Sequence, residues 1–329
     1  MNSSKLYFKK DCDLSLIQSK KVGVIGFGNQ GRAQTLNLID NNVDVLVGLR
    51  DKSKTKFELE KNNIPYSTIE DVVSKVDVIV VLISDKSIKN CFYDNILKYL
   101  KQSQTIIFSH GYNIHYKLID VPKNVNVGMV APSGGGAVVR SKFLQGSGVP
   151  GLIAVHNDYT RTTLELIKSY GLAIGCANVC LFTSTFKEET ETDLYGEQAL
   201  LTGGLPLMID KSIKVLLEAG YSPLAAWFVC YYEIKMIVDL FHEKGFDYLY
   251  NAISDTARYG GLKSGDYLID DEYENKLKNI LKNIQNGNFV KDLKDNVDTL
   301  KYKSSLDTKH SDEISKIMNV LFEKTNKGK

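Results

Sequence analysis

A glycine-rich turn is the first feature of this chain that could carry chemistry. It reads G-x-G-x-x-G and consists of Gly26, Phe27, Gly28, Asn29, Gln30 and Gly31. An apolar run, 21–25, precedes it, and a helix-like segment, 32–39, follows. Such a strand, turn and helix bind dinucleotides, because the free N–H groups and positive dipole end of the helix face the phosphates. Gly26 would allow the tight turn, Gly28 the approach of a pyrophosphate, and Gly31 the packing of helix on strand.

The end of the next apolar run indicates which nucleotide binds. Segment 43–50 reads as a second strand and ends in Arg50, with Ser53 and Thr55 close behind. A guanidinium and two hydroxyls suit a 2′-phosphate, whereas an acidic residue would suit the ribose of NAD. Asp51 leaves NAD open as an alternative, and a solvated basic loop is another. We predict NADP(H).

An acidic segment later in the chain could hold a metal. On a helix, Glu189, Asp193 and Glu197 lie four residues apart and share one face. Like charges at this spacing repel each other unless a cation lies between them. Two interpretations remain open, a solvated acidic face and a site for Mg²⁺, which prefers carboxylate oxygens.

The elements that must position these residues follow from the hydrophobic pattern. Short apolar runs alternate with helical patterns over residues 20–183, which predicts a doubly wound parallel sheet with helices on both faces. The expected strands are 22–25, 43–49, 76–83, 105–109, 125–131 and 151–155, with one more starting at 172–174 and running towards Phe182. Ligands of such sheets bind beyond the carboxyl ends of the strands, where the glycine turn, 110–115 and 131–136 are expected.

The second part of the chain has helical periodicity and little strand signal. Helices are expected near 187–203, 207–219, 223–243, 246–258, 271–285 and 311–325. We therefore predict an NADP-binding Rossmann domain over 1–184 and an all-helical domain over 185–329. The helical domain has no obvious core of its own, and the lysine- and aspartate-rich tail from Asn286 onward is expected to form a surface extension.

Composition excludes several other classes of function. The formal charge of +2 offers no argument for nucleic acid or a membrane surface, and 43% hydrophobic residues is ordinary for a globular protein. No apolar run approaches the roughly 18 residues that a spanning helix needs. The N-terminus lacks the apolar stretch of a signal peptide, and the five scattered cysteines read as reduced thiols. We expect a cytoplasmic protein.

The chain resembles the ketol-acid reductoisomerases of the short bacterial class. The shared segments run in the family's order and are 26–31, 48–50, 110–115, 130–132, 148–150, 152–156, 186–198, 217–221, 237–240 and 253–257. The resemblance implies a Rossmann domain followed by a knotted helical domain, binding of NADPH and two Mg²⁺, and a dimer or multiple of dimers. It also implies alkyl migration in a 2-acetohydroxy acid and reduction of the resulting 2-keto acid, in valine and isoleucine synthesis.

The resemblance assigns roles residue by residue. His110 matches the catalytic histidine, Asp193 the carboxylate that bridges both metals, and Glu197 a ligand of the first metal that also belongs to the catalytic set. Glu233 matches a ligand of the second metal and Ser254 a substrate-binding serine, both contributed by the partner subunit in the family. The loop of Arg50, Ser53 and Thr55 matches the family's phosphate-binding loop.

Three positions depart from the family pattern. Ser133 stands in place of a catalytic lysine, Val229 in place of a metal-binding glutamate, and Arg258 in place of a glutamate. Valine cannot coordinate Mg²⁺, and alkyl migration needs both ions as Lewis acids. Hydride transfer needs only bound NADPH, one polarised carbonyl or imine, and a proton source. Arg258 could dock a substrate carboxylate, or it could be a surface arginine on a helix end.

Three functions therefore remain open from the sequence. The first is a complete NADPH-dependent reductoisomerase, and the second is a paralogue that only reduces a 2-keto acid or imine. The third is a non-catalytic nucleotide-binding protein, against which the intact glycine turn, His110, Asp193 and Glu197 argue.

Overall fold

The computed structural model describes residues 4–296, 305 and 308–326. Contacts between Cα atoms divide the chain into two compact units, Met1–Thr192 and Asp193–Lys329. Among the described residues, no helix is both long and apolar enough to cross a membrane.

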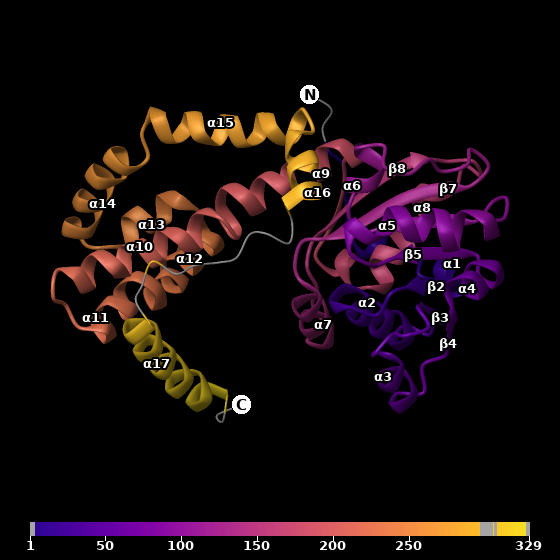
Figure 1. The fold of residues 1–329 in the computed structure, drawn as a ribbon, viewed down its shortest axis with the longest axis horizontal. Coiled ribbons are helices and arrows are strands. Elements are labelled where there is room, and N and C mark those ends of the chain that lie inside the picture. Colours follow the sequence, from indigo (N-terminus) through magenta and orange to yellow (C-terminus); the bar gives the residue numbers. More distant parts are fainter. Residues whose placement is uncertain (1–3, 297–304, 306–307, 327–329) are drawn as a thin grey trace. The chain divides into compact units, whose positions relative to one another are not determined.

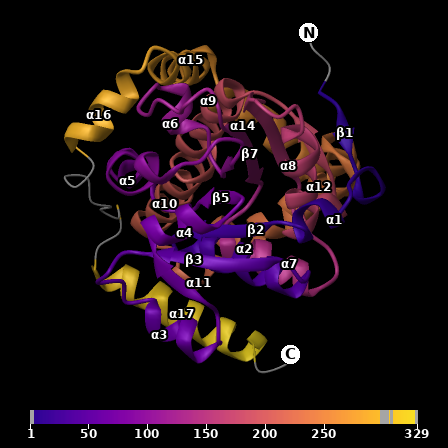
Figure 2. The same ribbon diagram turned by 90° about the vertical axis from the view of Figure 1, so that its right-hand side faces the viewer.

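The first unit is built on a single sheet (Figures 1 and 2). Its strands are β1 (Leu6–Tyr7), β2 (Lys21–Ile25), β3 (Asp44–Leu49), β4 (Tyr66–Thr68), β5 (Val78–Val81), β6 (Thr105–Phe108), β7 (Asn126–Pro132), β8 (Gly151–Asn157) and β9 (Leu181–Thr183). Their order is β1-β9-β8-β7-β6-β5-β2-β3-β4. Neighbours from β4 through β7 are parallel, β8 is antiparallel to β7 and parallel to β9, and β1 is antiparallel to β9.

Helices cover both faces of this sheet, which is why its central strands β5 and β6 are buried at every position. In β5, Val78 and Val80 join one core, and Ile79 and Val81 join the other. The first core includes side chains of α1 (Ser15–Gln18), α2 (Asn29–Asp40), α3 (Lys56–Lys61), α7 (Gly136–Leu144) and α8 (Thr163–Ala173). The second includes those of α4 (Ile69–Lys75), α5 (Asp85–Cys91), α6 (Tyr112–His115) and α9 (Phe186–Gly196).

The carboxyl ends of four parallel strands bring predicted site residues of the first unit to one edge of the sheet. The glycine turn follows β2, Arg50 follows β3, His110 comes two residues after β6, and Ser133 follows β7. This arrangement confirms the prediction that the site-bearing segments share one edge.

Two expectations for the sheet are wrong in detail. The structure confirms the six predicted strands as β2, β3, β5, β6, β7 and β8. Leu172 and Ala173, however, end helix α8, Ile174 is its C-cap, and β9 begins only at Leu181. A three-residue apolar run fits a helix as well as a strand. The sheet is also mixed rather than wholly parallel. Gly151 pairs with Pro132, so the connection 133–150 returns to the edge it left and β8 must run back.

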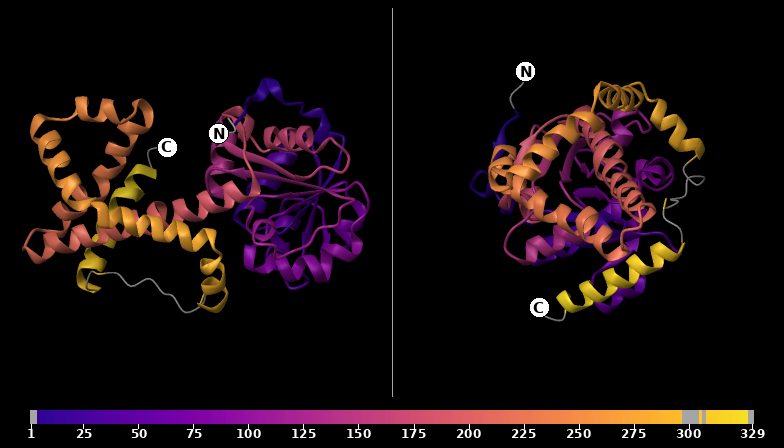
Figure 3. Two further views of the ribbon diagram at one scale, coloured as in Figure 1. Left: turned by 90° about the horizontal axis from the view of Figure 1, so that it is seen from above. Right: turned by 90° about the vertical axis from the view of Figure 1, so that its left-hand side faces the viewer.

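The second unit is helical (Figure 3). Its helices are α10 (Gly204–Glu218), α11 (Pro223–Trp227), α12 (Glu233–Lys244), α13 (Phe246–Ala252), α14 (Asp255–Leu268), α15 (Asp271–Gln285), α16 (Asn288–Asn296) and α17 (Thr308–Asn326). Two π-helical segments, Glu197–Leu201 and Phe228–Tyr232, follow α9 and α11 directly. Trp227, Ile213 and Ile314 form a small core in which α17 packs with α10 and α11.

The structure corrects three expectations in this unit. The helix predicted over 246–258 is broken at Ile253, because Ser254 caps the start of α14 with a bond from the Ala257 N–H. Helix α16 was not predicted, and the tail is not merely a surface extension, since Ile314 of α17 is buried. A small core exists where none was predicted. Residues 297–304, 306–307 and 327–329 of that tail lie outside the described residues, and the knot stays a prediction.

Candidate functional site

The glycine turn has the backbone geometry that its sequence predicts. Gly26 has φ +97°, a backbone conformation that residues other than glycine rarely adopt. A Cβ on Gly31 would lie 2.3 Å from the Gly26 carbonyl oxygen, so helix α2 can start this close to β2 only without a side chain there. A Cβ on Gly28 would meet nothing within 4 Å, so this part of the turn faces open space.

A pocket of about 190 Å³ joins this turn to the end of β3. Its lining residues are Gly26, Phe27, Gly28, Gly48, Leu49, Arg50, Ser53 and Thr55. The hydroxyls of Ser53 and Thr55 lie 2.8 Å apart, and Arg50 is exposed at the rim. None of the lining residues carries a carboxylate, so the donors that suit a 2′-phosphate are unopposed within the pocket. The structure thus brings together six of the nine residues predicted for the cofactor, and the other three, 29–31, form the first turn of α2.

The loop after β7 is attached to the same turn. The Gln30 side-chain amide donates to the Gly134 carbonyl oxygen at 2.8 Å. Gly136, the first residue of α7, approaches so closely that a Cβ there would lie 2.1 Å from the Asn29 carbonyl oxygen. Ser133 is exposed in this loop, and its N–H donates to the Pro150 carbonyl oxygen at 2.8 Å. The position that holds lysine in the family therefore lies beside the glycine turn.

His110 is held by a buried carboxylate. Its Nδ1 lies 2.9 Å from Oε1 of Glu189, and the N–H of Gly111 donates to the other carboxylate oxygen at 2.7 Å. Glu189 is 4% exposed, and each of its two carboxylate oxygens accepts one hydrogen bond from this strand-end segment. The sequence singled out Glu189 only as a member of the acidic face. Its contact with His110 joins residues 79 positions apart, and nothing in the sequence near either residue indicated it.

These two residues and Asp193 form a group that could hold a metal ion. Ligand atoms of His110, Glu189 and Asp193 all lie within 4.8 Å of one another, and Asp193 is exposed. Two carboxylates with an open side suit Mg²⁺, which takes oxygen ligands and keeps several waters. The donors present therefore fit the ion that the family resemblance implies.

The other predicted metal residues are not gathered at this group. Glu197 begins the π-helical segment after α9 and is exposed. Glu233 begins α12, also after a π-helical segment, and is exposed, and Val229 is 53% exposed four residues before it. The π-turns shift the helical register at both places.

The predicted substrate residues both belong to the start of α14. Ser254 is exposed and accepts the Ala257 N–H at 3.2 Å, as a helix N-cap. Arg258 pairs with Asp255 at 2.7 Å on the surface of the same helix. The structure describes them as a cap and a surface pair, and their predicted roles toward substrate remain predictions.

Sequence reasoning missed a second histidine–carboxylate contact on α9. His115 Nε2 lies 3.2 Å from Oε1 of Glu191 without hydrogen-bond alignment, and both side chains are largely buried. Burial lowers the pKa of His115 below its usual value, and the Glu191 carboxylate offsets part of that shift. The only sequence signal was the spacing of the two histidines in segment 110–115.

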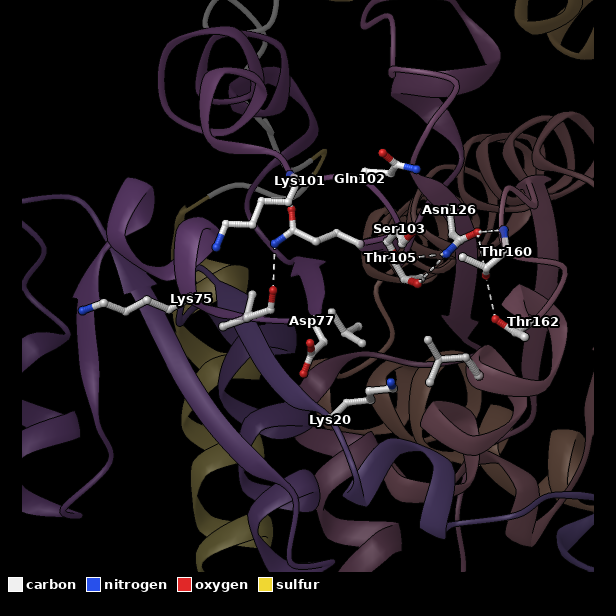
Figure 4. Close-up of a pocket in the computed structure, with 14 residues that line it drawn as sticks. Lys20, Lys75, Asp77, Lys101, Gln102, Ser103, Thr105, Asn126, Thr160 and Thr162 are labelled. Atoms are coloured by element: carbon white, nitrogen blue, oxygen red, sulfur yellow. Dashed lines mark hydrogen bonds between the residues drawn. The ribbon is translucent and has the colours of Figure 1, made fainter.

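A polar pocket of about 420 Å³ lies at the opposite, amino-terminal edge of the sheet (Figure 4). Figure 4 shows Asn126 among the lining residues, where its side-chain oxygen accepts the Thr160 N–H at 2.9 Å and its amide donates to Thr105 Oγ1 at 3.2 Å. Lys20 and Asp77 also line it. The Asn126 side chain is satisfied by these hydrogen bonds, and none of the predicted site residues lines the pocket.

Comparisons with known proteins agree on one family. Residues 16–179 match the family model of the acetohydroxy acid isomeroreductase NADPH-binding domain, and residues 186–325 match that of the ketol-acid reductoisomerase C-terminal domain. A protein of Methanothermobacter thermautotrophicus named ketol-acid reductoisomerase (NADP(+)) is 44% identical over 288 residues, which cover 88% of each chain. A Campylobacter hominis protein of the same name is 46% identical over 287 residues, covering 87% of this chain and 84% of the relative.

A solved structure supports the same conclusion. The structure of an NADH-preferring ketol-acid reductoisomerase from an uncultured archean matches with a TM-score of 0.85 at 34% identity, covering 89% of this chain and 90% of that chain.

Proposed function

This chain belongs to the ketol-acid reductoisomerase family, and on that premise we propose that it is an NADP-dependent ketol-acid reductoisomerase of valine and isoleucine synthesis. The observation that carries this proposal is the placement of His110, clamped by Glu189 beside Asp193, at the sheet edge that also holds the glycine turn. The relatives named above supply the reaction class, and this geometry supplies a histidine and two carboxylates at the sheet edge that holds the glycine turn.

The residues of the first unit bind and orient the cofactor. The N-terminus of α2 receives the pyrophosphate, because its first N–H groups have no helical partner and carry the positive end of the helix dipole. Arg50, Ser53 and Thr55 receive the 2′-phosphate through charge-assisted and hydroxyl hydrogen bonds. Gln30 binds the loop of Ser133 through the Gly134 carbonyl oxygen, so this loop lies beside the turn that would hold the cofactor.

His110 and the two carboxylates serve the reacting end. When bound, NADPH supplies the hydride and Mg²⁺ polarises the substrate oxygens. Glu189 accepts from Nδ1 of His110 and thereby fixes the tautomer in which Nε2 can take or return a proton. Glu189 and Asp193 would hold Mg²⁺ in this chain, and Glu197 remains the further ligand that the family resemblance assigns.

A second candidate, a reductase that does not isomerise, is favoured by two substitutions. Ser133 is too short to extend a cation into the site as the family lysine does, and Val229 offers no ligand atom beside Glu233. Alkyl migration depends on both of these groups in the family, whereas reduction depends mainly on the cofactor and one polarised carbonyl.

One assay separates these candidates. Oxidation of NADPH is followed with 2-acetolactate and, separately, with its already isomerised 2-keto acid, each with and without Mg²⁺. Turnover of both substrates supports the reductoisomerase, and turnover of the keto acid alone supports the reductase. Turnover of neither contradicts both. In the second case, the double variant Ser133→Lys, Val229→Glu should gain activity on 2-acetolactate.

We also propose that Arg258 docks a substrate carboxylate. In the isolated chain it is paired with Asp255 and 46% exposed, so it would exchange this partner for the substrate. Arg258→Ala should then raise KM for the acid without changing NADPH affinity, and an unchanged KM would leave Arg258 as a surface residue.

The second unit supports a proposal about assembly. Helices α12 and α14 bury none of their residues, and exposed apolar side chains include Met236, Ile237, Tyr259 and Leu262. We propose a cytoplasmic homodimer, or a multiple of it, in which these helices are covered and Glu233 and Ser254 reach the partner's site. Sedimentation at micromolar concentration should give a dimer or larger species, and an active monomer would contradict the proposal.

A further inference from the structure

The segment from His110 to Tyr116 touches helix α9 at two separate places. At the first, His110 and Gly111 both bind the Glu189 carboxylate, at 2.9 and 2.7 Å. At the second, His115 lies 3.2 Å from Glu191. The backbone is packed equally closely between them, since a Cβ on Gly111 would lie 2.6 Å from the Phe186 carbonyl oxygen. All of these residues belong to the first unit.

The two contacts lie on different sides of α9. Residues two apart on an α-helix are separated by about 200° around its axis, so Glu189 and Glu191 point in nearly opposite directions. Side-chain tips lie about 6 Å from the axis, and a rotation of about 20° would move each of them by about 2 Å. Such a rotation would break the Glu189 bonds and the His115 contact together. Two contacts of this kind therefore hold the rotation of α9 about its own axis more firmly than one.

The second contact is largely shielded from water. The side chains of His115 and Glu191 are 15% and 9% exposed. His115 Nε2 makes no aligned hydrogen bond among the described residues, and the Glu191 carboxylate oxygen lies 3.2 Å from it. Tyr116 packs on the His115 ring, with ring centroids 4.6 Å apart, and limits its movement.

The rotation of α9 matters because the next turn carries Asp193. Asp193 follows Glu189 by four residues, so both lie on nearly the same side of the helix. We propose that His115 and Glu191 are a positioning pair, which sets the rotation of α9 and thereby places the carboxylates of Glu189 and Asp193 against His110. This role deepens the proposed function and rests on it for its chemical meaning, although the mechanical claim can be tested without metal or substrate.

The test measures hydrogen exchange of the Gly111 amide in the whole, metal-free chain. This amide donates to Glu189, so its exchange reports whether α9 keeps its rotation. Glu191→Ala and His115→Phe should speed Gly111 exchange about tenfold, while the amide of Ile107, in the buried strand β6, should not change. Glu191→Gln keeps an oxygen at the same place and should restore most of the protection.

A matched variant and a second measurement complete the design. Glu188→Gln alters an exposed carboxyl on the same helix and should leave Gly111 exchange unchanged. Calorimetry should show Mg²⁺ binding about tenfold weaker in Glu191→Ala and His115→Phe, with NADPH affinity unaltered. Equal acceleration at Gly111 and Ile107 would mean general destabilisation and would overturn the proposal, as would unchanged Gly111 exchange. A wild-type chain without turnover but with these exchange effects would overturn the proposed function alone.

Discussion

Replacing Gly136 with alanine would place a methyl group against the backbone of the glycine turn. The added Cβ would lie 2.1 Å from the carbonyl oxygen and 2.4 Å from the carbonyl carbon of Asn29. Real Cβ contacts essentially never fall below 3.0 Å, so the two backbones must separate by about 1 Å. The obstacle is backbone, which cannot turn away as a flexible side chain would.

The expected cost follows from this displacement. Overpacking of a well-packed contact typically costs about 1–3 kcal/mol, which corresponds to a fall of about 2–12 °C in the melting temperature of a unit of this size. Because Asn29 begins helix α2, its movement also shifts the N–H groups proposed to bind the pyrophosphate. We expect NADPH affinity to fall about tenfold, since misplacements near 1 Å are costly at binding sites.

Thermal unfolding and fluorescence titration with NADPH measure both effects. Gly134→Ala is the matched control, because a Cβ at that position would meet its nearest atom, Val149 Cγ1, at an ordinary 3.6 Å. The control should melt within about 2 °C of the wild type and bind NADPH equally well. If Gly136→Ala behaved like Gly134→Ala in both measurements, the inferred contact between α7 and the glycine turn would be refuted.

Three further outcomes are expected. Arg50→Asp should weaken NADPH binding about 10- to 150-fold, because a hydrogen bond to a charged group contributes about 1.5–3 kcal/mol, and should weaken NADH binding far less; equal losses would exclude a 2′-phosphate contact. Calorimetry in saturating NADPH should detect one firmly bound Mg²⁺ per chain, and two would show that another group replaces the missing glutamate at Val229. The lowered pKa of His115 means that the unfolded chain binds its proton more readily, so the free energy of unfolding should fall as pH drops below about 6.5. Denaturant titrations at pH 7.5 and 5.5 should show a smaller fall for His115→Phe, and an equal fall would contradict this assignment.

Local chemistry explains why the cofactor site could be predicted from the sequence. Gly26 has a positive φ, and a Cβ on Gly31 would clash with the Gly26 carbonyl oxygen. Both requirements for glycine arise within a few residues of chain. The apolar runs of β2, β5 and β6 are buried on both faces, and such runs are legible without knowing their neighbours. Arg50 follows its strand directly, so parallel pairing of β2 and β3 was sufficient to bring it to the turn.

Longer-range features were not predictable in this way. The reversal of β8 depends on where the connection after β7 returns, and the break between α13 and α14 depends on Ser254 acting as a cap within an otherwise helical pattern. The short strands β1 and β4 have too few residues to show a period of two.

In the candidate active site, too, some features could be predicted from the sequence and others only from the tertiary structure. Its residue types were determined by the sequence alone: a histidine after β6, carboxylates on α9, and serine and valine where the family has lysine and glutamate. Only the tertiary structure decided that Glu189 binds His110 and that Glu191 faces His115. The physical reason is that these partners are 79 and 76 positions apart, and a helix presents each side chain in a direction that becomes meaningful only once the helix is packed.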